Sequence, residues 1–291
     1  MGGAALANRE RMKIFVFMRE LIFVTLGMLT LPMQGVEFIS HRGESIEAPE
    51  NTMAAFKLAW AKNSDSIELD IHRTADGKIV VCHDTTTKRT TGTEGKLSEM
   101  TLANIQRLDA GSFKDPRFIG EKMPELAQVL EAMPHGRCFI EIKSGEDVVP
   151  ALAEYLKNSS IPKNRLVLIS FNEKALKHAH DLLPDLKSYL VASMRKDKET
   201  GVIKPSLDSL IASARKNGFH GLDLGFSPLI DAETVKKVKS EGLEFYVWTV
   251  NKTADAQTAM SIGVDGITSD RAAALKVELT GGSTTPSPAQ N

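Results

Sequence analysis

The segment "SIELDIHRTADGKIVVCHD", residues 66–84, decides how the strands of this chain are counted. Its two apolar runs, 66–72 and 78–83, are separated only by a short segment that contains Asp76-Gly77, a dipeptide typical of hairpin turns. Parallel strands need a crossover of about a dozen residues or more, so these two runs are predicted to pair antiparallel. The turn would return His83 to the level of Asp70. The second run is therefore expected to rise from the sheet as a hairpin.

Apolar strand-like runs alternate with helical patterns over the rest of the chain. The strand-like runs are 36–41, 66–72, 78–83, 137–143, 165–171, 187–193, 219–225, 243–250 and 264–268, and helices are expected at 52–62, 101–108, 124–133, 147–158, 172–182, 206–217, 231–241, 253–261 and 271–278. Repeated β–α units predict parallel strands with crossover helices, and eight such units close a barrel. Because 78–83 belongs to a hairpin, the nine runs reduce to eight. The fold class predicted is α/β, a TIM (β/α)8 barrel over residues 36–280, with a small insertion at about 85–123.

The composition is that of an ordinary soluble domain with a sizeable core, 42% hydrophobic and 25% charged residues. The net charge is −1, from 36 basic and 37 acidic residues, so no overall field favours nucleic acid or an anionic membrane. No GxGxxG or GxxxxGK[ST] loop indicates nucleotide binding. Cys82 and Cys138 lie inside apolar runs and are expected to be buried and unpaired.

The two ends of the chain are expected to lie outside the barrel. Four basic residues precede the uncharged segment "LIFVTLGMLTLPM", residues 21–33, as in an export signal. This segment is short for a spanning helix, which needs about 20 apolar residues. We expect residues 1–35 to be a signal peptide that sends the protein to the periplasm or outside the cell. The alternative is an uncleaved N-terminal membrane anchor. The small polar residues of 281–291 predict a disordered tail.

Strand alternation predicts a cluster of carboxylates at one end of the barrel. Glu68 and Asp70 alternate with apolar residues that would face the helices, and Glu141 and Lys143 alternate likewise on another strand. Three carboxylates that converge are costly unless a positive charge lies among them, and Lys143 alone cannot neutralise all three. Oxygen ligands of this kind favour a divalent cation, Ca²⁺ or Mg²⁺.

Two histidines and an arginine are predicted to reach the same end. His41 and Arg42 end the first strand and His83 arrives by the hairpin, at the C-terminal face where sites of barrel enzymes lie. Two imidazoles suit paired general acid and base work, and a metal with Arg42 and Lys143 suits a phosphoryl group. This set favours phosphodiester cleavage over carbonyl or redox chemistry.

The order of these motifs resembles that of the glycerophosphodiester phosphodiesterase family. The matching segments are "HRG…PENT", "ELDIHRTADGKIVVCHD", "TTGTEGK", "MPELAQVL", "EIK" and "YVWTVN", from about Val36 to Ala274. The resemblance implies a TIM barrel that hydrolyses glycerophosphodiesters to an alcohol and glycerol 3-phosphate. It implies attack by the glycerol 2-hydroxyl on phosphorus, followed by opening of a cyclic phosphate by water. The roles it implies are an acid/base pair (His41, His83), metal ligands (Glu68, Asp70, Glu141) and phosphate contacts (Arg42, with Lys143 at phosphate or metal).

Further residues are candidates on weaker grounds. Asn51 is expected to cap the following helix and is also a candidate substrate contact. Trp248 is expected to face the barrel axis, where it would either line the pocket or pack in the core. Asp270 is expected to cap the last helix. Asp223 faces the axis without a motif to recommend it, and His72 is expected to be a bystander at the mouth or a substrate contact.

Two alternatives remain open at this stage. One is a related barrel phospholipase that acts on intact lipid, which would show an exposed apolar rim. The other is a non-catalytic barrel that binds glycerophosphodiesters or wall polymers. A small-molecule substrate is the partner expected, with no nucleic acid, and with a membrane only through the N-terminal segment if it stays uncleaved.

Overall fold

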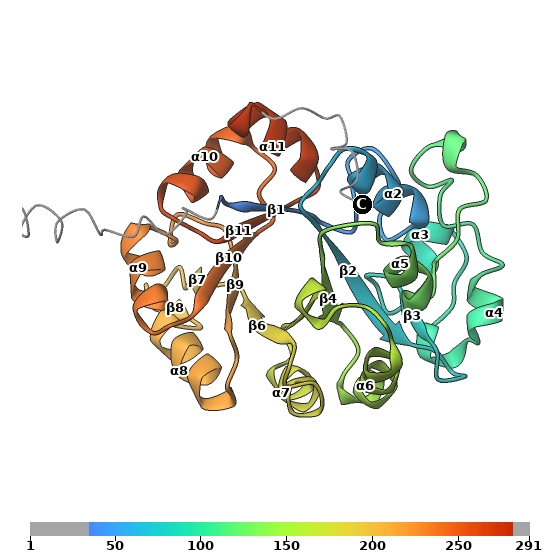
Figure 1. Ribbon diagram of the computed structural model, residues 1–291, viewed down its shortest axis with the longest axis horizontal. Helices are drawn as coiled ribbons and strands as arrows, with labels where there is room; N and C mark the ends of the chain where they lie inside the picture. The colour runs from blue at the N-terminus through green and yellow to red at the C-terminus, as the bar shows by residue number, and fades with distance from the viewer. Residues whose placement is uncertain (1–34, 282–291) are drawn as a thin grey trace, which may run out of the picture. The chain divides into compact units, whose positions relative to one another are not determined.

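The computed structural model describes residues 35–281, so the expected signal segment and the tail beyond residue 281 lie outside the described residues. Eight parallel strands form the barrel, and helices on its outside connect each strand to the next (Figure 1). The strands are β1 (Glu37–Ser40), β2 (Ser66–Arg73), β4 (Arg137–Ile142), β5 (Leu166–Ser170), β6 (Lys187–Ala192), β9 (Gly221–Gly225), β10 (Glu244–Trp248) and β11 (Gly266–Ser269). The helices are α2 (Met53–Ala61), α5 (Leu126–Ala132), α6 (Val149–Asn158), α7 (Glu173–Leu182), α8 (Leu207–Asn217), α9 (Ala232–Ser240), α10 (Thr253–Ser261) and α11 (Ala272–Thr280).

The sheet closes because β1 pairs with both β11 and β2. The predicted barrel is thereby confirmed. Alternate strand residues divide between two apolar cores, one between strands and helices and one inside the barrel. Ile67, Leu69 and Ile71 of β2 lie in the outer core, as the alternation predicted. Their neighbours Glu68 and Asp70 consequently point into the barrel.

The barrel is packed shut toward its N-terminal end. Seven buried side chains fill the interior there and below the pocket: Ile39, Phe139, Val167, Ile169, Tyr189, Val191 and Tyr246. At the same end, Arg137 forms an ion pair with Glu37 and donates a 2.7 Å hydrogen bond to the Tyr246 hydroxyl. These contacts form the floor beneath the functional end of the barrel.

The hairpin predicted at Asp76-Gly77 is present. Strand β3 (Ile79–Val81) pairs antiparallel with the upper part of β2, and the Cys82 amide donates to the Asp70 carbonyl at 3.0 Å. Gly77 has a φ of +76°, which a residue with a side chain rarely adopts. The predicted register of the hairpin is confirmed, so His83 follows directly above the Asp70 level.

The insertion after the hairpin has its own small core. It contains α3 (Lys88–Thr91) and α4 (Leu102–Ile105), which is shorter than the helix expected at 101–108. Cys82 is buried among Leu97, Leu102 and Ile105 of this insertion, and neither cysteine is in a disulfide. The insertion therefore fixes the end of β3 from which His83 projects.

One further hairpin was not predicted. Strands β7 (Arg195–Lys196) and β8 (Ile203–Lys204) pair antiparallel in the connection between β6 and α8. Each is two residues long and mostly charged, so neither carries the alternating apolar pattern that identifies a strand in a sequence. Across residues 35–281, the helices are all too short or too polar to cross a membrane.

Candidate active site

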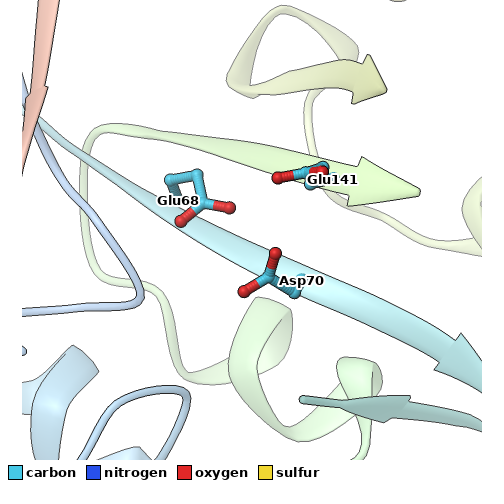
Figure 2. A group of neighbouring side chains, drawn as sticks. All are labelled: Glu68, Asp70 and Glu141. Atoms are coloured by element: carbon cyan, nitrogen blue, oxygen red, sulfur yellow. The ribbon is translucent and has the colours of Figure 1, made fainter. Parts of the chain in front are cut away.

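Three carboxylates meet at the C-terminal end of two adjacent strands. Glu68 and Asp70 lie on β2, and Glu141 lies on β4 directly opposite Asp70 in the parallel register (Figure 2). One ligand oxygen of each residue lies within 4.8 Å of the other two. All three side chains are buried. The structure thus brings the three predicted metal ligands together.

The environment of this cluster fits a divalent cation. Glu68 Oε1 and Asp70 Oδ1 are buried and have no hydrogen-bond partner within the described part of the chain. Burial, with the neighbouring charge of Asp70, raises the pKa of Glu68 well above its usual range and that of Glu141 to about 7. Carboxylates that are crowded and dehydrated, with oxygens that lack a hydrogen-bond donor, favour a hard cation such as Ca²⁺ or Mg²⁺.

Two cations border the carboxylates without neutralising them fully. Lys143 Nζ lies 3.0 Å from Glu141 Oε1 and 3.7 Å from Asp70 Oδ1. Arg42 Nε lies 3.2 Å from Asp70 Oδ2, although not in hydrogen-bonding geometry, and the Arg42 amide donates to Glu68 Oε2 at 2.9 Å. Both cations also line the pocket, so they are available to an anionic substrate.

The backbone of the His-Arg-Gly segment makes a tight turn that delivers these groups. Arg42 and Gly43 have φ values of +56° and +80°. A Cβ at Gly43 would lie 2.6 Å from the backbone carbon of Ala55, in the first turn of α2. Glycine is therefore required here, because the turn lies against the first turn of that helix.

His41 is held by a carboxylate that the sequence analysis placed elsewhere. Its Nδ1 lies 2.6 Å from Asp270 Oδ1, and since a carboxylate only accepts, Nδ1 donates. Asp270 also accepts from Asn251 Nδ2 at 2.6 Å and from Ser45 Oγ at 3.2 Å. Burial alone would raise the pKa of Asp270, but these hydrogen bonds, first that of His41, hold it at about 2. An ionised Asp270 thus holds a hydrogen on His41 Nδ1, which leaves Nε2 to face the pocket.

His83 has an equivalent partner. Its Nδ1 lies 2.8 Å from Asp84 Oδ1, and hydrogen bonds from Arg89 lower the pKa of Asp84 to about 2. Arg89 also binds Glu50 through two hydrogen bonds of 2.8 Å. Burial lowers the pKa of His83 itself. Both histidines therefore present Nε2 to the pocket.

A cavity of about 230 Å³ joins these groups. Its lining includes every predicted acid, base and phosphate-contact residue, together with Glu68 and Glu141, and it is walled by Trp248 and Phe171. Their rings meet edge to face at a centroid distance of 5.3 Å. Trp248 thus lies at the pocket, where the sequence placed it, whereas Phe171 was not singled out.

Two of the capping predictions are wrong. Thr52, not Asn51, caps α2, because Asn51 has a φ of +56° and turns its amide inward, where Nδ2 donates to Asp70 Oδ2 at 2.8 Å. Asn51 lies behind Asp70 and outside the pocket lining. Asp270 does not cap α11, because its carboxylate is occupied by His41 and Asn251.

Asn251 was missed by the sequence analysis, and Asp270 was given another role. Asn251 and Asp270 each follow a barrel strand at its C-terminal end, which is the signal that could have identified them. His72 is buried, and its Nε2 lies 3.1 Å from the His83 carbonyl oxygen, so it supports the strand end. Asp223 lines the pocket from β9.

The closed barrel, with a pocket at the C-terminal end of its strands, is the architecture of a barrel enzyme. Residues 41–274 match the model of the Glycerophosphoryl diester phosphodiesterase family, and the chain belongs to this family. The resemblance proposed from the motifs is confirmed, as is the prediction that the chain is an enzyme of this kind.

Similar proteins carry the same family name. A glycerophosphodiester phosphodiesterase of Caldanaerobacter subterraneus subsp. tengcongensis is 36% identical over 237 residues, covering 80% of this chain and 93% of the relative. One from Bacillus subtilis is 31% identical over 251 residues, covering 79% and 81%. The structure of an Oleispira antarctica phosphodiesterase in complex with the product sn-glycerol-3-phosphate superposes with a TM-score of 0.74 at 26% identity, over 84% of this chain and 96% of the other.

Proposed function

We propose that this protein hydrolyses glycerophosphodiesters to an alcohol and sn-glycerol 3-phosphate. The observation that carries the proposal is the pair of imidazoles, His41 and His83, which line one cavity and each donate Nδ1 to an aspartate. Family membership and the product bound to the Oleispira antarctica relative support this choice of substrate.

The paired histidines would act at opposite ends of the reaction. One imidazole, neutral, accepts the proton of the glycerol 2-hydroxyl at Nε2, and the hydroxyl oxygen attacks phosphorus. The other imidazole, protonated, donates its proton to the oxygen of the departing alcohol. A cyclic phosphate and a free alcohol result. In the second step the roles reverse: water loses a proton to one imidazole and the ring oxygen gains one from the other. Arg42 and Lys143 bind the phosphoryl oxygens.

Glu68, Asp70 and Glu141 would hold a divalent cation, Ca²⁺ or Mg²⁺. The buried oxygens of Glu68 and Asp70 that lack a hydrogen-bond partner support this assignment, since without a cation the cluster carries three crowded carboxyl groups and only two flanking cations. When bound, such an ion supplies positive charge that stabilises the phosphoryl group in the transition state.

The size of the cavity favours a small diester over an intact lipid. Its volume of about 230 Å³ lies below the roughly 300–1,000 Å³ of pockets that hold drug-sized ligands. A binding protein without activity would have no need for two imidazoles held by carboxylates, and this set is complete in the chain.

The test is a product assay with glycerophosphocholine, in which release of glycerol 3-phosphate and choline is measured with and without Ca²⁺ or Mg²⁺. We expect both products, and loss of activity in excess chelator. Full activity in chelator would contradict the metal assignment, and full activity of His41→Ala or His83→Ala would contradict the acid/base pair.

We also propose that the enzyme works outside the cytoplasm, in the periplasm or beyond it. Support comes from the sequence of residues 1–35 alone, with a basic segment before an uncharged apolar one. Mass determination of the exported protein would show whether this segment is removed or retained as an anchor.

A further inference from the structure

Asp223 is a buried carboxyl on the wall of the pocket opposite the metal-ligand cluster. It lies on β9, between Val191 of β6 and Tyr246 of β10 in the parallel register. In the closed barrel, three strands separate β9 from β2 in either direction. Asp223 consequently faces Glu68 and Asp70 from across the pocket.

Its side chain has no hydrogen-bond partner within residues 35–281. The residue is 2% exposed, and Oδ1 is enclosed without a donor, although the side chain lines the cavity. A carboxyl group buried in this way destabilises the fold, and on the wall of a substrate pocket a bound ligand can complete its hydrogen bonds. The position of Asp223 therefore indicates a binding role rather than a structural one.

The surroundings of Asp223 indicate what it would bind. Arg42 and Lys143 lie beside the carboxylates of β2 and β4, so an anionic phosphoryl group is drawn to that side of the cavity. Between the two walls, Ile169 and Val191 offer only apolar surface. A ligand that spans the cavity would place its phosphate at the cations, its carbon chain over these side chains and a polar end group at Asp223.

Protonation agrees with a hydroxyl as this end group. Burial, and secondly the charge of Glu141, raises the pKa of Asp223 to about 8. A carboxyl that is largely neutral near pH 7 donates one hydrogen bond and accepts another, and a hydroxyl group also does both.

The backbone of the same residue helps to set its position. Trp248 Nε1 donates to the Asp223 carbonyl at 3.1 Å, which links β9 to the aromatic wall of the pocket. The carboxyl is thus carried by a strand that is fixed on both sides.

We propose that Asp223 binds the terminal hydroxyl of the glycerol chain and makes the site specific for polyol phosphodiesters. The inference rests on the proposed function and adds a specificity-determining residue to it. The hydroxyl adjacent to the phosphate-bearing carbon would remain near the histidines, while the terminal one, a carbon further from phosphorus, reaches the opposite wall.

Two substrates that differ by one oxygen test this role. Glycerophosphocholine is compared with its 1-deoxy analogue, in which a methyl group replaces the terminal CH₂OH and the secondary hydroxyl is kept. Choline release gives kcat/KM for both. A site that binds a hydroxyl rejects the analogue lacking it strongly, so we expect the wild-type enzyme to prefer glycerophosphocholine by roughly 10²- to 10⁴-fold.

In Asp223→Ala the preference is expected to fall to within about 10-fold, whereas Asp223→Asn, which still donates and accepts, should retain most of it. The melting temperature of Asp223→Ala should equal or exceed that of the wild type, because the variant removes an unpaired buried carboxyl. An unchanged preference in Asp223→Ala would overturn the proposal, as would an equal loss on both substrates together with a lower melting temperature. If the wild-type enzyme released choline from neither substrate, the proposed function would be the part that fails.

Discussion

Asp270→Asn should slow the enzyme strongly although residue 270 is not expected to contact substrate. In the wild type, Asp270 accepts from His41 Nδ1 at 2.6 Å and so places the free lone pair of the imidazole on Nε2. In the variant, an amide can turn its NH₂ group toward Nδ1 and stabilise the tautomer that carries hydrogen on Nε2. That tautomer cannot accept a proton from substrate.

The size of the effect follows from the hydrogen bond and the tautomer together. A hydrogen bond to a charged group contributes about 1.5–3 kcal/mol, and each 1.36 kcal/mol of barrier is tenfold in rate, so loss of this bond alone costs roughly 10- to 150-fold. The wrong tautomer adds to this, and the same change in a serine-protease triad costs about 10⁴-fold. We expect kcat to fall by roughly 10²- to 10⁴-fold, with little change in KM.

The assay is steady-state release of glycerol 3-phosphate by the wild type, by Asp270→Asn, and by the same change in a His41→Ala background. Because Asp270 acts through His41, its replacement should have almost no effect once the imidazole is absent. Asp255→Asn is a matched control on α10, outside the pocket lining, and should retain wild-type activity. The reasoning would be refuted if Asp270→Asn kept wild-type kcat, or if its effect were equally large without His41.

Three other outcomes are expected. A diester with 4-nitrophenol as leaving group needs no proton donor, so the variant that lacks the general acid, either His41→Ala or His83→Ala, should recover roughly 10²-fold of its lost rate on this substrate. If each variant lost the same rate on this diester as on glycerophosphocholine, paired acid and base roles would be contradicted. Gly43→Ala should lower the free energy of unfolding in urea by at least about 2 kcal/mol, more than the control Gly77→Ala, which shares a positive φ but meets only a flexible side chain. Burial lowers the pKa of His220, so the unfolded chain binds more protons below about pH 6.5 and stability is lost as pH falls through that region. His220→Asn should therefore lose less melting temperature between pH 7 and pH 5 than the wild type, and an identical loss would contradict this account.

The sequence was sufficient for features that depend on local periodicity. Alternation along β2 placed Glu68 and Asp70 inside the barrel because side chains in a strand change face at each residue. The Asp76-Gly77 turn gave the antiparallel hairpin and hence the level of His83, because only a tight turn fits between the two runs.

Features that depend on closure of the barrel could not be predicted in the same way. Asp270 lies 229 residues from His41 in the chain, and the two meet because β1 pairs with β11. Without that register, a helix cap was the simplest role for an aspartate before a helix. The prediction that Asn51 caps α2 was wrong for a local reason. Its left-handed backbone conformation turns the side chain away from the helix end and toward Asp70.

The closed floor of the barrel has a consequence for the order of events at the site. Tyr189, Tyr246 and the ion pair of Arg137 with Glu37 fill the end opposite the pocket. Substrate, water and both products therefore share the C-terminal end of the barrel, where Phe171 and Trp248 line the pocket. In a two-step reaction the departing alcohol occupies the path that the second reactant needs. Release of the alcohol, rather than bond breaking, is then the event that sets the time between the two chemical steps.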